Sequence, residues 1–160
     1  MFRAILQKDK QVLKALIAAL LHLKKESIHD VAITNPIELG AAISDKDFIL
    51  DIRVNLNNEQ LIDLEMQMSN EYNWSERSIS YAARSFDQLN SGEEYKEVLP
   101  VHSIGFLNFT LFEDQPEFFA TYELRNKKTG HLYSSKFSIH VLDLTRIDLA
   151  TAEDQNYEIG

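Results

Sequence analysis

Two carboxylates in the first half of the chain have the spacing needed to meet across a β-hairpin. Two runs of alternating apolar and polar side chains are separated by three polar residues, 57–59. If these three residues form the hairpin loop, Leu56 lies opposite Gln60. The same register places Asp51 opposite Glu65. Directly opposed side chains of a hairpin have Cβ atoms roughly 4.5–5.5 Å apart, so the two acids would share one site.

Such a pair of acids is what a divalent metal site needs. Like charges directly opposite each other destabilise a sheet unless something positive lies between them. A Mg²⁺ or Mn²⁺ ion, which prefers carboxylate and water oxygens, would resolve the conflict. Two alternatives stay open at this point: both carboxylates are solvated on an exposed face, or the register of the hairpin slips by two residues.

The parity of the two runs indicates which way their side chains point. The even-numbered residues of both runs are apolar, and the odd-numbered residues between them are polar. Because successive side chains of a strand point to opposite faces, the even positions are predicted to face a core and the odd positions to face outward. The same register pairs Arg53 with Asp63, which a cross-strand ion pair explains, and places Ile49 beside Gln67.

The elements around this hairpin follow from the periodicity of the apolar residues and from turn signals. The predicted elements are a helix over residues 2–24, a strand over 28–34, the hairpin over 48–69, a helix over 74–90, a strand over 98–109, and a second hairpin formed by 118–124 and 132–142 around the turn Lys127-Lys-Thr-Gly130. No repeat or linker interrupts residues 1–145, so one domain is predicted there. Residues 146–160 are predicted to form an acidic tail that is flexible or the remnant of a longer region.

Length and composition exclude several classes of protein. A chain of 160 residues with 44% hydrophobic content can bury one ordinary core. The chain has no cysteine, which excludes disulfides and thiolate metal sites. No run approaches the ~18–20 uninterrupted apolar residues of a membrane span, and no signal peptide is recognisable. We therefore expect no membrane partner and a cytoplasmic location.

The net charge of the whole chain argues against binding of nucleic acid, but the charge of its N-terminal segment does not. The formal net charge is -9, whereas proteins that bind DNA usually carry a basic footprint. Residues 1–30 contain six Lys or Arg and three acids, so this segment is positive while the remainder is strongly acidic. The segment could engage phosphate, or it could be the solvated face of a helix.

Four blocks of the sequence, in this order, are more specific than any spacing. They are Lys46-Asp-Phe-Ile-Leu-Asp51, Leu64-Glu-Met-Gln-Met-Ser-Asn70, Arg77 with Tyr81, and Pro100-Val-His-Ser-Ile-Gly-Phe-Leu-Asn-Phe109. With these blocks the chain, from about Phe2 to Leu144, resembles the recombination-promoting nuclease and transposase family of the PD-(D/E)XK nuclease superfamily. The resemblance implies an α/β fold with a restriction-endonuclease-like core of helix, strand, β-hairpin, helix and strand, here with an extra C-terminal β-hairpin.

The resemblance also implies roles for three residues of the hairpin. The aspartate and the glutamate of the family's D…ExQ motif bind the catalytic metal, which carries these roles to Asp51 and Glu65. Gln67 stands where the superfamily more often has lysine. A glutamine amide can orient water or phosphate by hydrogen bonding but cannot lend positive charge, so Mg²⁺ or Mn²⁺ would carry more of the catalysis. The implied activity is metal-dependent hydrolysis of DNA phosphodiester bonds.

Three further residues are candidates for contacts to DNA. Arg77 and Tyr81 lie four residues apart on the predicted second helix, so they share a face that the resemblance turns toward the substrate. The alternative is that Arg77 pairs with a surface acid and that Tyr81 packs with its hydroxyl at the rim. Lys46 could touch a phosphate, or it could be solvated beside Asp45 and Asp47.

Other polar residues are less informative. Glu38 and Asp9 are candidates for the extra acidic ligand that the superfamily often supplies from upstream of the first strand. The five histidines show no metal-ligand spacing and are interpreted as structural or surface residues. They are His22, His29, His102, His131 and His140.

One departure from the family pattern bears on activity. Family members usually have an aspartate a few residues before a Phe-Lys or Phe-Arg pair, and here Phe2-Arg3 directly follows Met1. The departure leaves the fold expected and puts activity in question. Three hypotheses follow: a metal-dependent DNA endonuclease, a catalytically silent or truncated fragment that acts as a DNA-binding or protein-interaction module, and an acidic scaffold unrelated to nucleic acid. A homodimer is left open.

Overall fold

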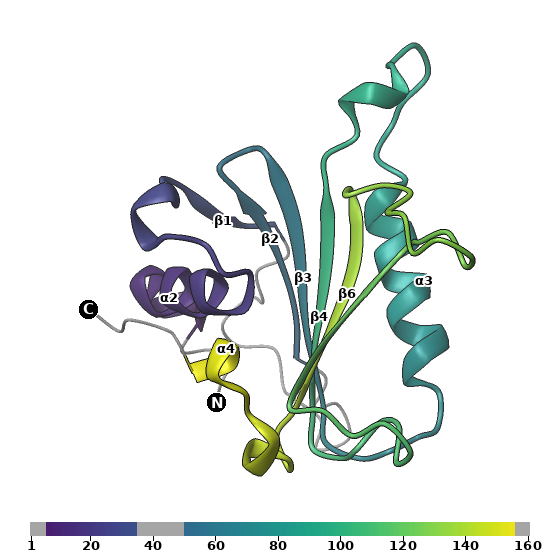
Figure 1. Cartoon of the computed structure of the whole chain (residues 1–160). Coiled ribbons are helices and arrows are strands. Elements are labelled where there is room, and N and C mark those ends of the chain that lie inside the picture. Colours follow the sequence, from purple (N-terminus) through teal and green to yellow (C-terminus); the bar gives the residue numbers. More distant parts are fainter. Residues whose placement is uncertain (1–5, 35–49, 156–160) are drawn as a thin grey trace.

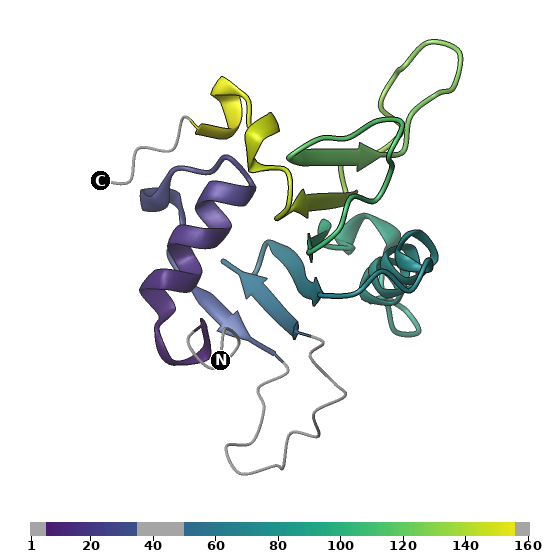
Figure 2. The same cartoon turned by 90° about the horizontal axis from the view of Figure 1, so that it is seen from below.

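The computed structural model describes residues 6–34 and 50–155, and the side chains at positions 50, 51 and 155 lie outside that description. In the described part a mixed β-sheet of six strands, in the order β1-β2-β3-β4-β6-β5, separates two helices, α2 and α3 (Figures 1 and 2). The strands are β1 (Val31–Ile33), β2 (Leu50–Leu56), β3 (Gln60–Gln67), β4 (Val101–Leu107), β5 (Phe119–Glu123) and β6 (Phe137–Asp143). The helices are α2 (Lys10–Leu20), α3 (Trp74–Phe86) and α4 (Ala152–Gln155), with short 3-10 turns at Lys25–Ser27, Tyr95–Glu97 and Ile147–Leu149.

The predicted order of helix, strand, hairpin, helix and strand is confirmed. Antiparallel pairing joins β1 to β2 and β2 to β3, whereas β3 and β4 pair in parallel across the crossover helix α3. The parallel pairing makes β3 an interior strand of the sheet. The backbone of β3 is therefore paired with a neighbouring strand along both of its edges.

The central hairpin has the predicted three-residue loop. Leu56 is the partner of Gln60, and Asn57 and Asn58 adopt positive φ angles of 56° and 57°. Asparagine tolerates this left-handed conformation better than most residues. The Asn57 side chain also accepts hydrogen bonds from the backbone N–H groups of His29 and Asp30, at 2.8 and 2.9 Å. These bonds tie the loop to the segment that leads into β1 and help to hold the register.

The predicted helix over residues 2–24 is interrupted in its described part. Residues 6–8 are helical, but Asp9 has extended backbone angles and begins α2 as its N-cap. The Asp9 carboxylate accepts hydrogen bonds from the backbone N–H groups of Gln11 and Val12, at 2.9 and 3.2 Å. Aspartate is a strong N-cap because it satisfies amides that have no partner within the helix. This capping role gives Asp9 a structural function.

The main core lies between α2 and the even face of the sheet. Apolar residues of α2 recur at helical spacing, and they pack with even-numbered residues of the hairpin and of β4. The fully buried members of this core include Leu13 and Ile17 from α2 and Ile52, Ile62, Leu64 and Ile104 from the sheet. The prediction that the even positions face a core is confirmed.

The prediction that the odd positions face outward is wrong for β3. Asp63, Glu65 and Gln67 are only 6%, 7% and 7% exposed. They are buried because α3 lies over the odd face, so that the sheet is covered on both sides (Figure 2). Parity shows that odd and even residues point to opposite faces, but it does not show which face remains open to solvent.

The second predicted hairpin is present, and it extends the sheet. β5 and β6 pair antiparallel, and an isolated bridge between Arg125 and Leu132 leads into the turn. Gly130 has a φ of 72° there, a conformation that favours glycine. β6 also pairs in parallel with β4, so the hairpin completes one edge of the main sheet.

The acidic C-terminal segment contains short elements in its described part. A 3-10 turn at Ile147–Leu149 is followed by α4, and Thr151 and Asp154 exchange hydrogen bonds at the start of α4. Both views place α4 on the side of the sheet that α2 covers (Figures 1 and 2). The proposed division of the chain at residue 145 stays a prediction.

Candidate functional site

The two candidate metal ligands lie opposite each other in the hairpin backbone. Asp51 on β2 is the register partner of Glu65 on β3, as the loop length predicts. Glu65 is held between β2 and β4, where its other partner is Gly105. The register alternative, a slip by two residues, is therefore excluded.

The carboxylate of Glu65 is buried and is paired with an arginine of α3. Arg77 Nε donates a hydrogen bond to Glu65 Oε1 at 2.5 Å, and the two side chains are 20% and 10% exposed. Burial alone would lower the pKa of Arg77, but the hydrogen bond to Glu65 and the charge of this carboxylate outweigh it and leave the pKa raised. The alternative that Arg77 pairs with a surface acid is wrong, because its partner is the candidate metal ligand itself.

Arg77 belongs to a stack of three side chains along α3. Its guanidinium carbon lies 5.4 Å from the centroid of the Tyr81 ring, and that of Arg84 lies 5.8 Å from the same centroid. Both distances are within the range of cation–π attraction. Sequence reasoning brought Arg77 and Tyr81 together but missed Arg84. Arg84 lies three residues after Tyr81 on the predicted helix, and this spacing indicates that the two side chains are neighbours on its surface.

Gln67 contributes an unpartnered oxygen to the same face of β3. Two residues after Glu65, its side chain points to the same side of the sheet. Gln67 Nε2 donates to the backbone oxygen of Ser69 at 2.9 Å, which fixes the orientation of the amide. Gln67 Oε1 is buried and has no hydrogen-bond partner among the described atoms. A buried carbonyl oxygen without a partner is costly, so this atom is suited to accept a hydrogen bond from a bound water.

The start of α3 is pressed onto the sheet beside Glu65. A Cβ atom added to Gly105 would lie 2.0 Å from Cζ2 of Trp74, so the indole ring occupies the space that a side chain would take. Trp74 is 2% exposed and packs with Leu107 and Val141. This contact anchors the first turn of α3, three residues before Arg77.

The other acid of β3 on this face, Asp63, is also paired. Ser85 Oγ donates a hydrogen bond to Asp63 Oδ2, and Arg53 Nε lies 3.5 Å from Asp63 Oδ1. The predicted cross-strand ion pair of Arg53 and Asp63 is confirmed. Asp63 and Glu65 therefore bind two different positions of α3, one near each end of the helix.

Several of the residues predicted from the sequence cannot be placed relative to Glu65. Lys46, Ile49 and Glu38 lie outside the described residues, and so does the side chain of Asp51. The basic segment that contains α2 covers the opposite face of the sheet from α3 (Figures 1 and 2). The arginine that bonds Glu65 comes from α3.

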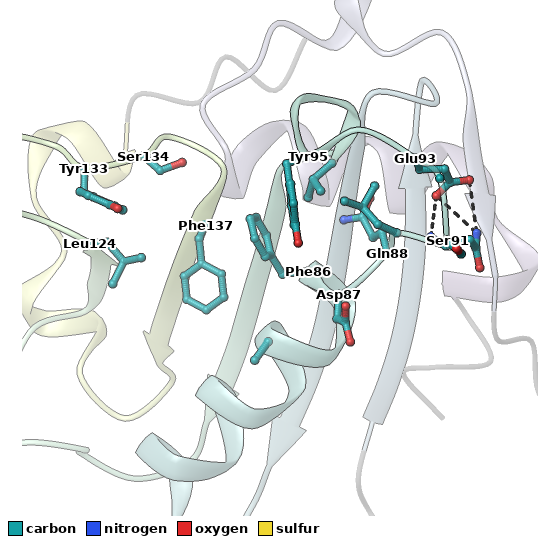
Figure 3. A pocket seen from close by; sticks show the side chains of 15 residues that line it. Phe86, Asp87, Gln88, Ser91, Glu93, Tyr95, Leu124, Tyr133, Ser134 and Phe137 are labelled. Atoms are coloured by element: carbon teal, nitrogen blue, oxygen red, sulfur yellow. Dashed lines mark hydrogen bonds between the residues drawn. The ribbon is translucent and has the colours of Figure 1, made fainter.

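A large cavity of about 860 Å³ lies elsewhere, at the C-terminal end of α3 (Figure 3). Phe86, Tyr95, Tyr133 and Phe137 contribute much of its wall. None of the site residues on β3 lines it, nor do Arg77 and Tyr81. The cavity is therefore separate from the candidate metal site.

The residues present fit a divalent ion. Among the described side chains, no group of three His, Cys, Asp or Glu is assembled that could hold a metal. The backbone register nevertheless pairs Asp51 with Glu65, and the partnerless oxygen of Gln67 lies two residues further along β3. Carboxylate and amide oxygens are the hard ligands that Mg²⁺ and Mn²⁺ prefer.

The fold and the site define a class of protein. A mixed α/β sheet that carries a D…ExQ hairpin, with a crossover helix over the acidic face, is consistent with a restriction-endonuclease-like fold. Residues 1–159 match the family model described as PD-(D/E)XK nuclease family transposase. The chain belongs to this family, as its sequence blocks indicated. It matched no curated protein and no solved structure.

Membership of a nuclease family implies DNA as the substrate. Within residues 6–34 and 50–155, no helix is long and apolar enough to cross a membrane.

Proposed function

We propose that this chain is a metal-dependent DNA endonuclease in which Asp51 and Glu65 hold a Mg²⁺ or Mn²⁺ ion. The observation that carries the proposal is the pairing of these two acids across the hairpin, with Glu65 buried on an interior strand. Two carboxylates on directly opposed residues of a hairpin repel each other unless a positive charge lies between or beside them. Membership of the family makes phosphodiester hydrolysis the expected chemistry.

The ion, when bound, supplies a water of lowered pKa and neutralises charge on a phosphate oxygen. The side chains supply the positioning. Gln67 Oε1 accepts a hydrogen bond from the attacking water, because its amide is already fixed by the bond from Nε2 to Ser69. Glu65 stays in place because its backbone is bonded on both sides, so its carboxylate needs little reorganisation on binding.

The helix α3 supplies candidate contacts to the DNA backbone. Arg77 and Arg84 stack on Tyr81 beside Glu65, and their guanidinium groups can donate to phosphate oxygens. In a chain with a formal charge of -9, such a local cluster would oppose the general repulsion of DNA. The proposed roles of Arg77 and Tyr81 in substrate binding remain those of the sequence prediction, with Arg84 added.

A second candidate function is a catalytically silent module that binds DNA or protein. The ion pair between Arg77 and Glu65 supports it, because a carboxylate that stays paired with arginine is a weaker ligand for a metal ion. This candidate predicts DNA binding that needs no divalent ion and survives the loss of Glu65. The cytoplasmic location and the homodimer stay predictions.

Nicking of supercoiled plasmid by the purified full chain tests the proposal. Wild-type protein is expected to nick in Mg²⁺ or Mn²⁺ and to stop in EDTA. Glu65→Gln is expected to abolish nicking, because a neutral amide cannot replace a carboxylate ligand. Lys46→Ala is expected to lower nicking only if this residue touches phosphate.

Asp63→Asn is the matched control for Glu65→Gln. Asp63 is equally buried on the same face of the same strand, but its partners are Ser85 and Arg53, and its hairpin partner is not an acid. Circular dichroism establishes that each variant is folded. Retained nicking by folded Glu65→Gln would refute the assignment, and metal-independent DNA binding without nicking would favour the silent module.

A further inference from the structure

The ion pair between Arg77 and Glu65 raises a question about the proposed metal site. Arg77 Nε lies 2.5 Å from the same carboxylate that would hold the ion. Two positive charges on one buried carboxylate repel each other strongly, since little water is present to screen them. Arginine cannot relieve this repulsion by losing a proton, because a guanidinium stays protonated in proteins. Only movement of the side chain can relieve it.

We infer that Arg77 is an exchangeable counter-ion, which neutralises Glu65 while the site holds no metal and leaves the carboxylate when a divalent ion binds. The inference rests on the proposed function and adds a regulatory step to it. In the metal-free protein, Arg77 provides the positive charge that the opposed pair of Asp51 and Glu65 requires. It is a positioning residue, because it acts on the site through Glu65.

The stack on Tyr81 can hold the guanidinium after its bond to Glu65 is released. The ring of Tyr81, one helical turn along α3, already lies 5.4 Å from the guanidinium carbon. Arg77 is partly exposed, so its side chain lies at the rim of the buried face and can turn outward. On Tyr81 its donors would face a phosphate instead of Glu65. Metal binding and DNA binding would then strengthen each other, because each favours the same outward position of Arg77.

Titration of Mn²⁺ into the metal-free full chain, with free Mn²⁺ measured by electron paramagnetic resonance, tests this inference. Arg77→Gln is expected to bind Mn²⁺ on the order of tenfold more tightly than wild type, because the ion no longer competes with a guanidinium. Arg77→Lys is expected to lie between the two.

Arg84→Gln is the matched control. Arg84 stacks on the same ring from the same helix, whereas Arg77 is the residue that bonds Glu65, so the loss of Arg84 is expected to leave Mn²⁺ affinity unchanged. A second readout is the N–H resonance of Arg77 Nε in wild-type protein, which is expected to shift when Mg²⁺ is added because the bond to Glu65 is broken.

The outcomes separate this inference from the proposed function. Equal or weaker Mn²⁺ binding by Arg77→Gln, with binding still lost in Glu65→Gln, would overturn the exchange and leave the metal site intact. Absence of Mn²⁺ binding in wild type, Arg77→Gln and Glu65→Gln alike would overturn both. If Arg77→Gln does not fold, Arg77→Lys decides: tighter binding than wild type supports the exchange, and equal or weaker binding refutes it.

Discussion

A carboxylate buried on an interior strand needs a positive partner, and the choice of partner decides what the residue can do. Glu65 is 7% exposed and bonded to Arg77, whereas Asp63 on the same face is bonded to Ser85 and Arg53. Removal of one member of a buried ion pair commonly costs about 3–5 kcal/mol, so the pair of Glu65 with Arg77 also holds α3 on the sheet. Function and stability are coupled at Glu65.

The other face of the sheet carries a buried histidine cluster that makes stability depend on pH. Ser138 Oγ lies 2.7 Å from His102 Nδ1 and 2.9 Å from His140 Nε2, and Thr121 Oγ1 lies 3.0 Å from His140 Nδ1. Phe119 stacks on the His140 ring at 5.9 Å. Burial is the main reason why the pKa of His140 falls from 6.5 to about 4. The charges of His102 and His22 lower this pKa further, whereas the charge of Glu123 raises it. The cluster agrees with the structural role predicted for these histidines.

We predict that His140 destabilises the fold as the pH falls. Between its unfolded pKa of 6.5 and its folded pKa of about 4, the unfolded chain binds a proton that the folded chain excludes. The free energy of unfolding is therefore highest above this pH window and falls by up to about 3 kcal/mol as the pH is lowered through it. Urea unfolding at several pH values checks this.

His140→Gln is expected to flatten that pH dependence, while His131→Gln, at an exposed histidine, is expected to leave it as in wild type. The same slope in wild type and in His140→Gln would contradict the prediction.

At the scale of elements, the position of α3 depends on one glycine. Gly105 on β4 leaves room for Trp74, and the contact fixes the first turn of α3 near Glu65. The first clash arises with atoms Cζ2, Cη2 and Cε2 of the indole, which lie 2.0, 2.7 and 2.9 Å from a Cβ at this position. Buried indole and backbone on both sides leave little space for adjustment.

Gly105→Ala is therefore predicted to lower the free energy of unfolding by about 1–3 kcal/mol or more, the usual effect of overpacking. Trp74→Phe removes the outer ring atoms, so it should relieve the clash and recover part of the loss in the double variant. Denaturant unfolding of the four proteins of this cycle measures the coupling. Additive effects of the two substitutions would show that Trp74 is not what opposes a side chain at position 105.

The elements also show what could be predicted from the sequence. The hairpin register was predictable because it depends on a loop of three residues and on strict alternation, both of which are local. The burial of Asp63, Glu65 and Gln67 was not, because it depends on parallel pairing with β4 and on the cover by α3. The break of the first helix at Asp9 was readable in principle, since aspartate is a frequent N-cap.

The candidate site was predictable from the sequence only where it depends on the hairpin. Asp51 and Glu65 could be paired from spacing, and the roles of both came from the family resemblance. The bond between Arg77 and Glu65 could not be foreseen, because the residues are 12 apart in sequence and meet only when α3 docks. The stack of Arg84 on Tyr81 follows from helical spacing and was overlooked.

At the scale of the whole molecule, basic segments lie on both sides of the sheet. The helix α2, which belongs to the basic N-terminal segment, and the helix α3, which carries Arg77 and Arg84, lie on opposite sides (Figure 1). A chain with a formal charge of -9 repels DNA at a distance, so contact with phosphate depends on short-range groups beside the site. We therefore propose that DNA binds on the α3 side, where Glu65 and Arg77 meet.

The most direct test of the central claim is a crystal structure of the full chain with Mn²⁺, in which anomalous scattering locates the ion. We predict a peak bound to the carboxylates of Asp51 and Glu65, with Arg77 turned away from Glu65. A structure in which both carboxylates are ordered, Arg77 still bonds Glu65 and Mn²⁺ lies elsewhere would contradict it.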